Sequence, residues 1–300
     1  MEEKILYIEN LRKKIEKHFF IILGISLTIA LIFVFLSSSY TAHTPAALIF
    51  FVIINFISFF LLGAITGYFK NYKEYKSKYK KVFVEEPFSQ AFDNVKFDLK
   101  NGINKDIIAG TDIMSMGNRY YSNDYIRGIY KNVDFERADV KIQNHTSNGK
   151  HSQTVTYLHG RWLIFEFNKN FHFDLQIIGK GFNYSKKRSS IFTSEAERRR
   201  KIEFEDIQFN KDFTVYAQDD LEAFYILTPQ FIDTLKNMAT IMDGNLMLGF
   251  VDNKLHVAIN TGKDAMEPSI FRSELKSSLA EVEKEINVII SIIEGLNLDR

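Results

Sequence analysis

FFIILGISLTIALIFVFLSSSYTAHTPAALIFFVIINFISFFLLGAITGYF, residues 19–69, contains no Asp, Glu, Lys or Arg. As helices, residues 19–36 would span about 27 Å and residues 46–69 about 36 Å, against a hydrocarbon core of about 30 Å in a lipid bilayer. Ser37 to Pro45 is short, polar and uncharged. The stretch therefore predicts a hairpin of two transmembrane helices joined by residues 37–45.

The flanking charges predict how the hairpin is oriented. Lysines and arginines lie at the outer ends of both apolar segments, and residues 70–81 hold six lysines against Glu74 alone. Basic flanks stay on the cytoplasmic side, so both termini are expected in the cytoplasm of a multi-pass inner (cytoplasmic) membrane protein. A cleaved signal peptide is the alternative. Its basic region would be unusually long, and a second apolar segment follows at once.

A tyrosine and lysine pattern follows the second apolar segment. Tyrosines recur at intervals of four, three and four residues, so they share one face of a helix that continues from the membrane, beside a stripe of lysines. Tyr suits the headgroup level, and Lys reaches anionic phosphates. The alternative is a flank that only fixes orientation. The predicted membrane-interface residues are Tyr68, Tyr72, Lys73, Tyr75, Lys76, Tyr79 and Lys80.

Residues 1–81 are thus expected to form the N-terminal segment, hairpin and basic stalk, and residues 82–300 one cytoplasmic domain. The latter is long enough to bury its own core. The chain has no cysteine, which excludes disulfides, Cys-ligated zinc, iron–sulfur clusters and thiol nucleophiles.

The pattern of residues 82–300 predicts an α+β fold. Segments rich in β-branched and aromatic residues at 125–143, 154–179 and 202–217 indicate strands, and residues 245–260 indicate a hairpin turning at Asp252-Asn253. Thr228 and Pro229 mark the start of a helix. We expect an antiparallel sheet with packed helices.

A long amphipathic helix is expected at about residues 270–296. Its apolar residues alternate at four and three, which suits either a coiled coil or a helix docked on its own domain. The partner-binding candidates on this helix are Leu275, Leu279, Val282, Ile286, Ile289 and Ile293.

The sequence lacks the familiar catalytic motifs: it has no phosphate-binding loop, GxSxG elbow, HExxH pair or EF-hand loop. Asp219, Asp220 and Glu222 follow a strand and are weak candidates for acid–base chemistry or cation binding, but Asp at a helix start is also a common N-cap. His256 alternates away from the core side of its hairpin and is expected to be exposed. No catalytic residue, metal site or cofactor is predicted.

A basic segment interrupts the predicted strands at residues 183–201. One interpretation is that this segment binds anionic lipid or nucleic acid. A solvated loop is the better one because Glu195 and Glu197 lie among the basic residues. No nucleic-acid partner is expected. The basic residues are Lys186, Lys187, Arg188, Arg198, Arg199, Arg200 and Lys201.

Several segments resemble a known family. The most specific is IEFEDIQFNKDFTVYAQDDLEAFYILTPQFIDTLKNM (202–238), and four others agree: NDYIRGIYKNVDF (123–135), HGRWLIFEFNKNF (159–171), LMLGFVDNKLHVAIN (246–260) and the EP of DAMEPSIF (264–271). The chain resembles, over about residues 85–271 and the hairpin, a bacterial membrane-anchored family, domain of unknown function 3137. Met266 departs from the Phe expected there. The resemblance implies a cytoplasmic α+β domain at the inner membrane and no activity, and it hints at a membrane complex with LemA-type proteins.

Three functional hypotheses remain open. The first is a membrane-tethered module that binds another protein, or itself, at the inner membrane. The second is an unrecognised membrane-bound enzyme acting on lipid or on a small ester or phosphate through the carboxylates above. The third is lipid binding or membrane organisation through the tyrosine and lysine stalk and the basic segment at residues 183–201.

Overall fold

The computed structural model describes residues 2–41, 45–149, 151–166, 175–182, 200–242, 244–271 and 275–295. The chain forms two compact units, one of Met1–Glu86 with Met266–Ala280 and one of Pro87–Ala265 with Glu281–Arg300. The sequence suggested a boundary after residue 81. The units divide after Glu86 instead, and a segment from late in the chain completes the N-terminal unit.

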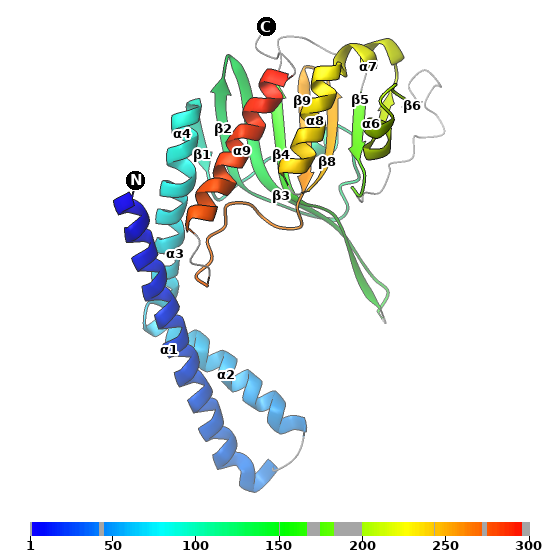
Figure 1. Ribbon diagram of the computed structural model, residues 1–300. Coiled ribbons are helices and arrows are strands. Elements are labelled where there is room, and N and C mark those ends of the chain that lie inside the picture. The colour runs from blue at the N-terminus through cyan, green and yellow to red at the C-terminus, as the bar shows by residue number, and fades with distance from the viewer. Residues whose placement is uncertain are drawn as a thin grey trace. The chain divides into compact units, whose positions relative to one another are not determined.

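The N-terminal unit is built from long helices (Figure 1). They are α1 (Glu2–Thr41), α2 (Pro45–Ile65) and α3 (Tyr68–Lys80), followed by one π-helical stretch, η1 (Lys81–Glu85). The predicted continuous helix through residue 67 was wrong. Gly67 has a φ of 72°, which is unfavourable for residues with a Cβ, and the helices on its two sides meet at 67°.

One helix in the described residues, Glu2–Phe33 of α1, is by itself long and apolar enough to cross a membrane. The described part of α2 meets the same criterion only when joined to α3 across the bend. The N-terminal apolar helix therefore supports membrane association of the chain.

The second unit contains a mixed sheet-and-helix fold, which confirms the predicted antiparallel sheet. Nine strands of the described residues form one antiparallel sheet in the order β1-β2-β3-β4-β9-β8-β5-β7-β6. The strands are β1 (Asp93–Asp98), β2 (Arg119–Tyr130), β3 (Val133–Ser147), β4 (Ser152–Glu166), β5 (Leu175–Gly179), β6 (Arg200–Ile202), β7 (Phe213–Ala217), β8 (Asn245–Val251) and β9 (Lys254–Asn260).

The hairpin of β8 and β9 forms as its sequence predicts. Phe250 pairs with Leu255, and the register continues through Leu248 with Val257. The turn lies at residues 252–253. Asp252 has a φ of 54°, a conformation that short polar side chains tolerate.

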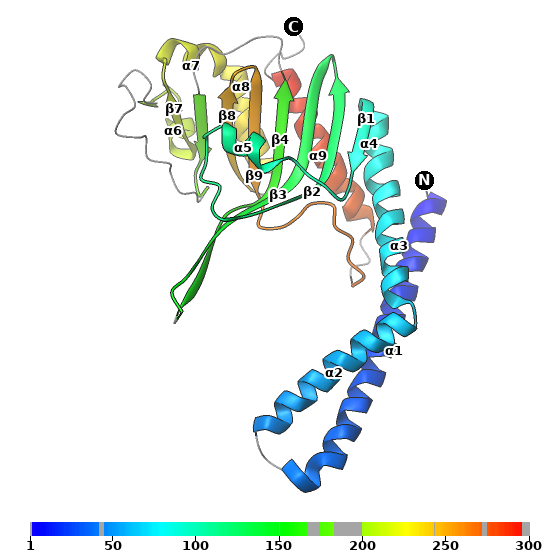
Figure 2. The same cartoon turned by 180° about the vertical axis from the view of Figure 1, so that it is seen from behind.

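Helices cover both faces of this sheet. α8 (Pro229–Ile241) and α9 (Leu275–Gly295) lie over one face in Figure 1, and α5 (Lys105–Gly110) lies over the other in Figure 2. The Thr228 hydroxyl accepts a hydrogen bond from the Phe231 amide at 3.2 Å, which confirms the predicted cap. The short helices of the described residues are α4 (Glu86–Ala91), α6 (Ile207–Asp212) and α7 (Asp220–Ile226).

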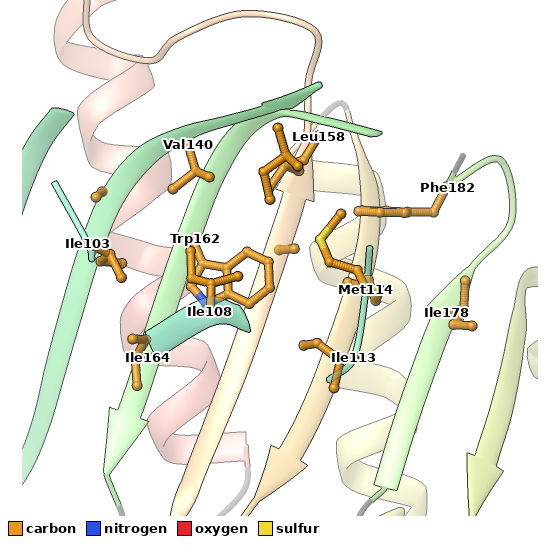
Figure 3. Close-up of a cluster of buried hydrophobic side chains, with 14 residues drawn as sticks. Ile103, Ile108, Ile113, Met114, Val140, Leu158, Trp162, Ile164, Ile178 and Phe182 are labelled. Carbon is orange, nitrogen blue, oxygen red and sulfur yellow. The ribbon is translucent and has the colours of Figure 1, made fainter. Parts of the chain in front are cut away.

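The face beneath α5 holds a dense apolar core around Trp162 (Figure 3). Ile108 of α5 lies against this face, and Ile103 and Ile113 flank it. His256 is on the same face and only 3% exposed, so its predicted exposure was wrong. The prediction assumed one solvated face, whereas residues 103–114 cover it. The Trp162 indole N–H donates to His256 Nδ1 at 3.1 Å.

Candidate functional site

The N-terminal half of α1 packs along α3 and η1, and we call residues 2–18 and 68–85 together the stalk. Ile8, Ile15 and Ile22 recur every seven residues on the buried side of α1 and share an apolar cluster with Tyr75 and Tyr79. A seven-residue repeat keeps one face of a helix against its partner helix. The stalk is therefore a short two-helix packing unit that continues from the apolar part of α1.

The tyrosine face predicted to meet lipid headgroups lies inside this unit. Tyr68, Tyr75 and Tyr79 are buried, and Tyr72 packs against the same cluster. Burial raises the pKa of Tyr75. The spacing correctly marks an amphipathic face. Its partner in the structure is α1, which a pattern confined to residues 68–80 cannot reveal.

The predicted lysine stripe divides into two groups. Lys73 is exposed, whereas Lys76 and Lys80 bind Glu267 at 2.7 and 2.8 Å, and Lys80 is buried. Burial alone would raise the pKa of Glu267, but hydrogen bonds from the two lysines outweigh it and lower the pKa. Only Lys73 of this stripe faces solvent without a bound carboxylate among the described residues.

Glu267 belongs to a segment, Met266–Phe271, that we call the strap. The buried Arg12 guanidinium donates to the Ile270 carbonyl at 2.6 Å, and the Tyr75 hydroxyl donates to the Ser269 carbonyl at 3.3 Å. The Phe271 ring lies 5.2 Å from that of Phe19. The EP motif thus holds a late part of the chain on the stalk, a role that its sequence did not indicate.

In the sheet unit, the strongest concentration of buried charge is a cluster of four side chains. Arg137 and Asp139 come from β3, Arg161 from β4 and Glu285 from α9, and none is more than 8% exposed. Glu285 accepts from Arg137 Nε at 2.7 Å and from Arg161 Nε at 2.8 Å. Arg137 Nη2 and Asp139 Oδ1 are 2.7 Å apart but misaligned for a hydrogen bond, so their contact is an ion pair.

Carboxylates outnumber guanidinium groups in this cluster once the buried Asp124 is included. Burial raises the pKa of Asp139 to about 7 despite Arg137, and the nearby Glu285 adds to the rise. Burial opposes ionisation of Glu285 too, but its two arginine partners outweigh this and lower its pKa. The second oxygen of Asp139 accepts the Ala265 amide at 3.0 Å.

Solvent reaches the edge of this cluster through a small pocket. Its volume is about 140 Å³, and Arg161 is the cluster residue that lines it, together with Asp264, Lys263 and Lys284. Within the described residues, Asp139 and Glu285 are buried and neither lines this pocket. The geometry therefore assigns the cluster a structural role, which is to hold α9 on the sheet.

The three weak catalytic candidates lie at the start of α7. Asp219 is its N-cap, and one carboxylate oxygen accepts from the Leu221 and Glu222 amides at 2.7 and 3.0 Å. Asp220 lies 3.5 Å from Arg200. Within the described residues, no group of three potential metal ligands comes together. This geometry is the capping arrangement that the sequence offered as the alternative.

The apolar stripe of α9 is covered by its own fold. Val282, Ile286, Ile289 and Ile293 are buried, and Leu279 is partly buried against the stalk cluster. The side chain of Leu275 and the basic residues 186–188, 198 and 199 lie outside the described residues. Of the two interpretations of this helix, the docked amphipathic helix is the one observed, so Val282, Ile286, Ile289 and Ile293 do not present a free partner-binding face.

An exposed apolar group that the sequence analysis missed lies on α6 and α7, and we call it the apolar patch. Leu221 is 80% exposed and Ile207 71%, and Phe224 and Tyr225 are also exposed. The ring of Phe204 joins the two helices, 5.0 Å from Phe224 and 5.6 Å from Phe209. Leu221, Phe224 and Tyr225 lie close together along α7, and a contiguous exposed apolar surface often marks an interaction site.

Comparisons with known proteins support the family resemblance. The family model described as Protein of unknown function (DUF3137) matches residues 156–298. No curated protein matches the chain. A crystal structure of the mycobacterial trehalose monomycolate transport factor A, TtfA, is similar with a TM-score of 0.37 and 6% identity, over 71% of this chain and 93% of that chain. A similarity that low carries no argument about function. Over residues 156–298, the match to this family model confirms the resemblance that the sequence suggested.

Proposed function

We propose that this chain is a membrane-tethered module that holds its sheet unit at the cytoplasmic face of the bacterial inner membrane, where it binds another protein. The observation that best supports the membrane tether is the exposure of large apolar side chains around both apolar helices. Phe35 and Ile32 on α1 and Phe56 and Val52 on α2 are all more than half exposed. A helix that is apolar all round needs a lipid or protein environment.

The packing of the stalk supports a hairpin topology. Because α1 before the apolar stretch contacts α3 after it, the packing favours a topology in which both ends of residues 19–69 lie on one side of the bilayer. An even number of crossings satisfies this. Asn55 of α2 and Ser26 of α1 lie 3.5 Å apart, and polar pairs of this kind stabilise helix packing in lipid.

The absence of cysteine allows a direct test of the topology, because every introduced cysteine is the only one. A membrane-impermeant maleimide added to intact spheroplasts is expected to label Ser39→Cys in the polar stretch of residues 37–45, between the two apolar segments. Ser77→Cys in the stalk and Lys100→Cys in the sheet unit should react only after permeabilisation, because basic flanks remain cytoplasmic.

Both cytoplasmic positions are exposed in the structure, so slow reaction would not reflect burial. Alkaline carbonate should leave all three variants in the membrane pellet. Labelling of Ser77→Cys in intact spheroplasts would show the opposite orientation, with the stalk outside the cytoplasm. Release of the protein by carbonate would contradict the proposal that the chain is inserted in the membrane.

For the protein partner, we propose the apolar patch on α6 and α7 as the contact surface. Residues 203–222 contain seven acidic residues and one lysine, so exposed carboxylates such as Glu205 and Asp220 surround the apolar side chains. The surface suits a segment that offers apolar and basic side chains together. This replaces α9, whose apolar residues are buried.

A photo-crosslinking residue at Leu221 is expected to give a discrete adduct in native membranes. The same residue at Lys105, which is exposed on α5, serves as the control and should give none. Adding Glu205→Lys should weaken the Leu221 adduct, because a basic partner would be repelled. An adduct of twice the 34.9 kDa chain mass would identify self-association. Equal crosslinking at Leu221 and Lys105 would reject the patch.

A further inference from the structure

Four exposed lysines flank the apolar stretch at the membrane end of the stalk. Lys14 and Lys17 precede Phe19, and Lys70 and Lys73 follow Phe69. Counted along the helices, each lies within about 8 Å of the apolar stretch. Among the described residues, none of the four has a carboxylate within ion-pair distance.

Stalk lysines farther from the apolar stretch are mostly paired. Lys76 and Lys80 bind Glu267, Lys78 binds Glu74 at 2.7 Å, and Lys4 binds Glu86 at 2.8 Å. Each of them lies about 10 Å or more from the apolar stretch along its helix. Lys81 departs from this division, since it is exposed and has no such pair among the described residues.

The carboxylates of the stalk near the four lysines form ion pairs with other residues. Glu16 and Glu9 bind the buried Arg12, each at 2.8 Å. Glu74 binds Lys78, and this hydrogen bond lowers the pKa of Glu74, with smaller contributions from Lys70 and Lys14. The four lysines nearest the apolar stretch therefore have no ion-paired carboxylate within the described stalk.

We propose that Lys14, Lys17, Lys70 and Lys73 form a collar that binds the phosphate groups of anionic phospholipids in the cytoplasmic leaflet. The inference rests on the membrane tether proposed above. Lipid phosphates lie at the level of the collar, within a Debye length of about 8 Å at physiological salt. Since the stalk tyrosines face α1, the lysines are the groups turned toward the lipid.

The test uses the full chain reconstituted into vesicles of phosphatidylcholine and phosphatidylglycerol in equal parts. Spin-labelled phosphatidylglycerol and spin-labelled phosphatidylcholine report how strongly the protein restricts each lipid. Near an anionic leaflet, one basic residue is worth about a fivefold change in association. Wild type is expected to select phosphatidylglycerol several-fold, and added salt should reduce this selectivity.

A variant with Gln at all four collar positions should lose the selectivity. The matched control is Lys→Gln at Lys96, Lys100, Lys105 and Lys211, which removes the same charge from exposed positions of the sheet unit. The control should behave as wild type. Equal loss in both variants, or no selectivity in wild type that has inserted into the vesicles, would overturn the collar. Failure of wild type to insert would instead reject the tether.

Discussion

Replacing Glu285 by glutamine is expected to lower the free energy of unfolding of the sheet unit by about 3–5 kcal/mol, the cost of removing one partner from a buried ion pair. Glu285 is 1% exposed and binds both Arg137 and Arg161. The neutral amide leaves the two guanidinium groups with Asp139 and Asp124, and Asp139 has a pKa raised to about 7. Urea unfolding in neutral detergent, followed by fluorescence of the single tryptophan, Trp162, measures this change.

Glu283→Gln is the matched control, because it makes the same chemical change at an exposed position of α9. Surface substitutions of this kind usually change stability by less than about 0.5 kcal/mol. If Glu285→Gln falls in the same small range, the cluster does not hold α9 in place. A large loss for Glu285→Gln alone would show that α9 depends on its buried charge as well as on its apolar stripe.

Features specified by neighbouring residues could be predicted from the sequence. The β8–β9 hairpin combines alternating apolar residues with a two-residue polar turn, and the start of α8 combines a capping hydroxyl with a proline. Both signals lie within a few residues. The structure reproduces each of them, including the pairing of Leu248 with Val257 and the hydrogen bond to Thr228.

Features that depend on distant partners could not be predicted in this way. The stalk tyrosines and the α9 stripe were both recognised as amphipathic, but the pattern does not say what an amphipathic face contacts. In the structure the tyrosines meet α1, and the α9 stripe is buried. We therefore propose the lipid role for the exposed collar lysines and the partner role for the apolar patch.

The buried charge cluster left one trace in the sequence. Glu285 stands directly before Ile286 and three residues after Val282, so it interrupts the apolar stripe of α9. A carboxylate at such a position requires a buried cation. The cation, Arg137, is 148 positions away in the sequence. Alternating charged residues on β3 predict a solvent-exposed strand face, because the sequence does not show that a helix covers that face.

Acidification is expected to remove about 3 kcal/mol of stability through His256, because its pKa is lowered to about 4 in the folded chain from an ordinary 6.5. Burial lowers this pKa most, and Lys254 adds to the effect. Between pH 6.5 and pH 4 the unfolded chain binds a proton that the folded chain excludes. The contribution is therefore complete above pH 6.5 and is lost as the pH falls to 4.

The titration of Asp139 changes the stability of the folded chain in the opposite direction to that of His256. The effect of His256 must therefore be measured by comparing variants. The raised pKa of Asp139 favours the folded state at low pH, and this contribution is lost as the pH rises from about 4 to 7. His256→Asn removes the titration of His256 and keeps an acceptor for the Trp162 N–H. Urea unfolding at pH 7, 6, 5 and 4, followed by circular dichroism, should show wild type losing about 3 kcal/mol more than His256→Asn. Parallel pH profiles would mean that the folded chain protonates His256 as readily as the unfolded chain does. That result would conflict with its acceptance of the indole N–H on a covered face of the sheet.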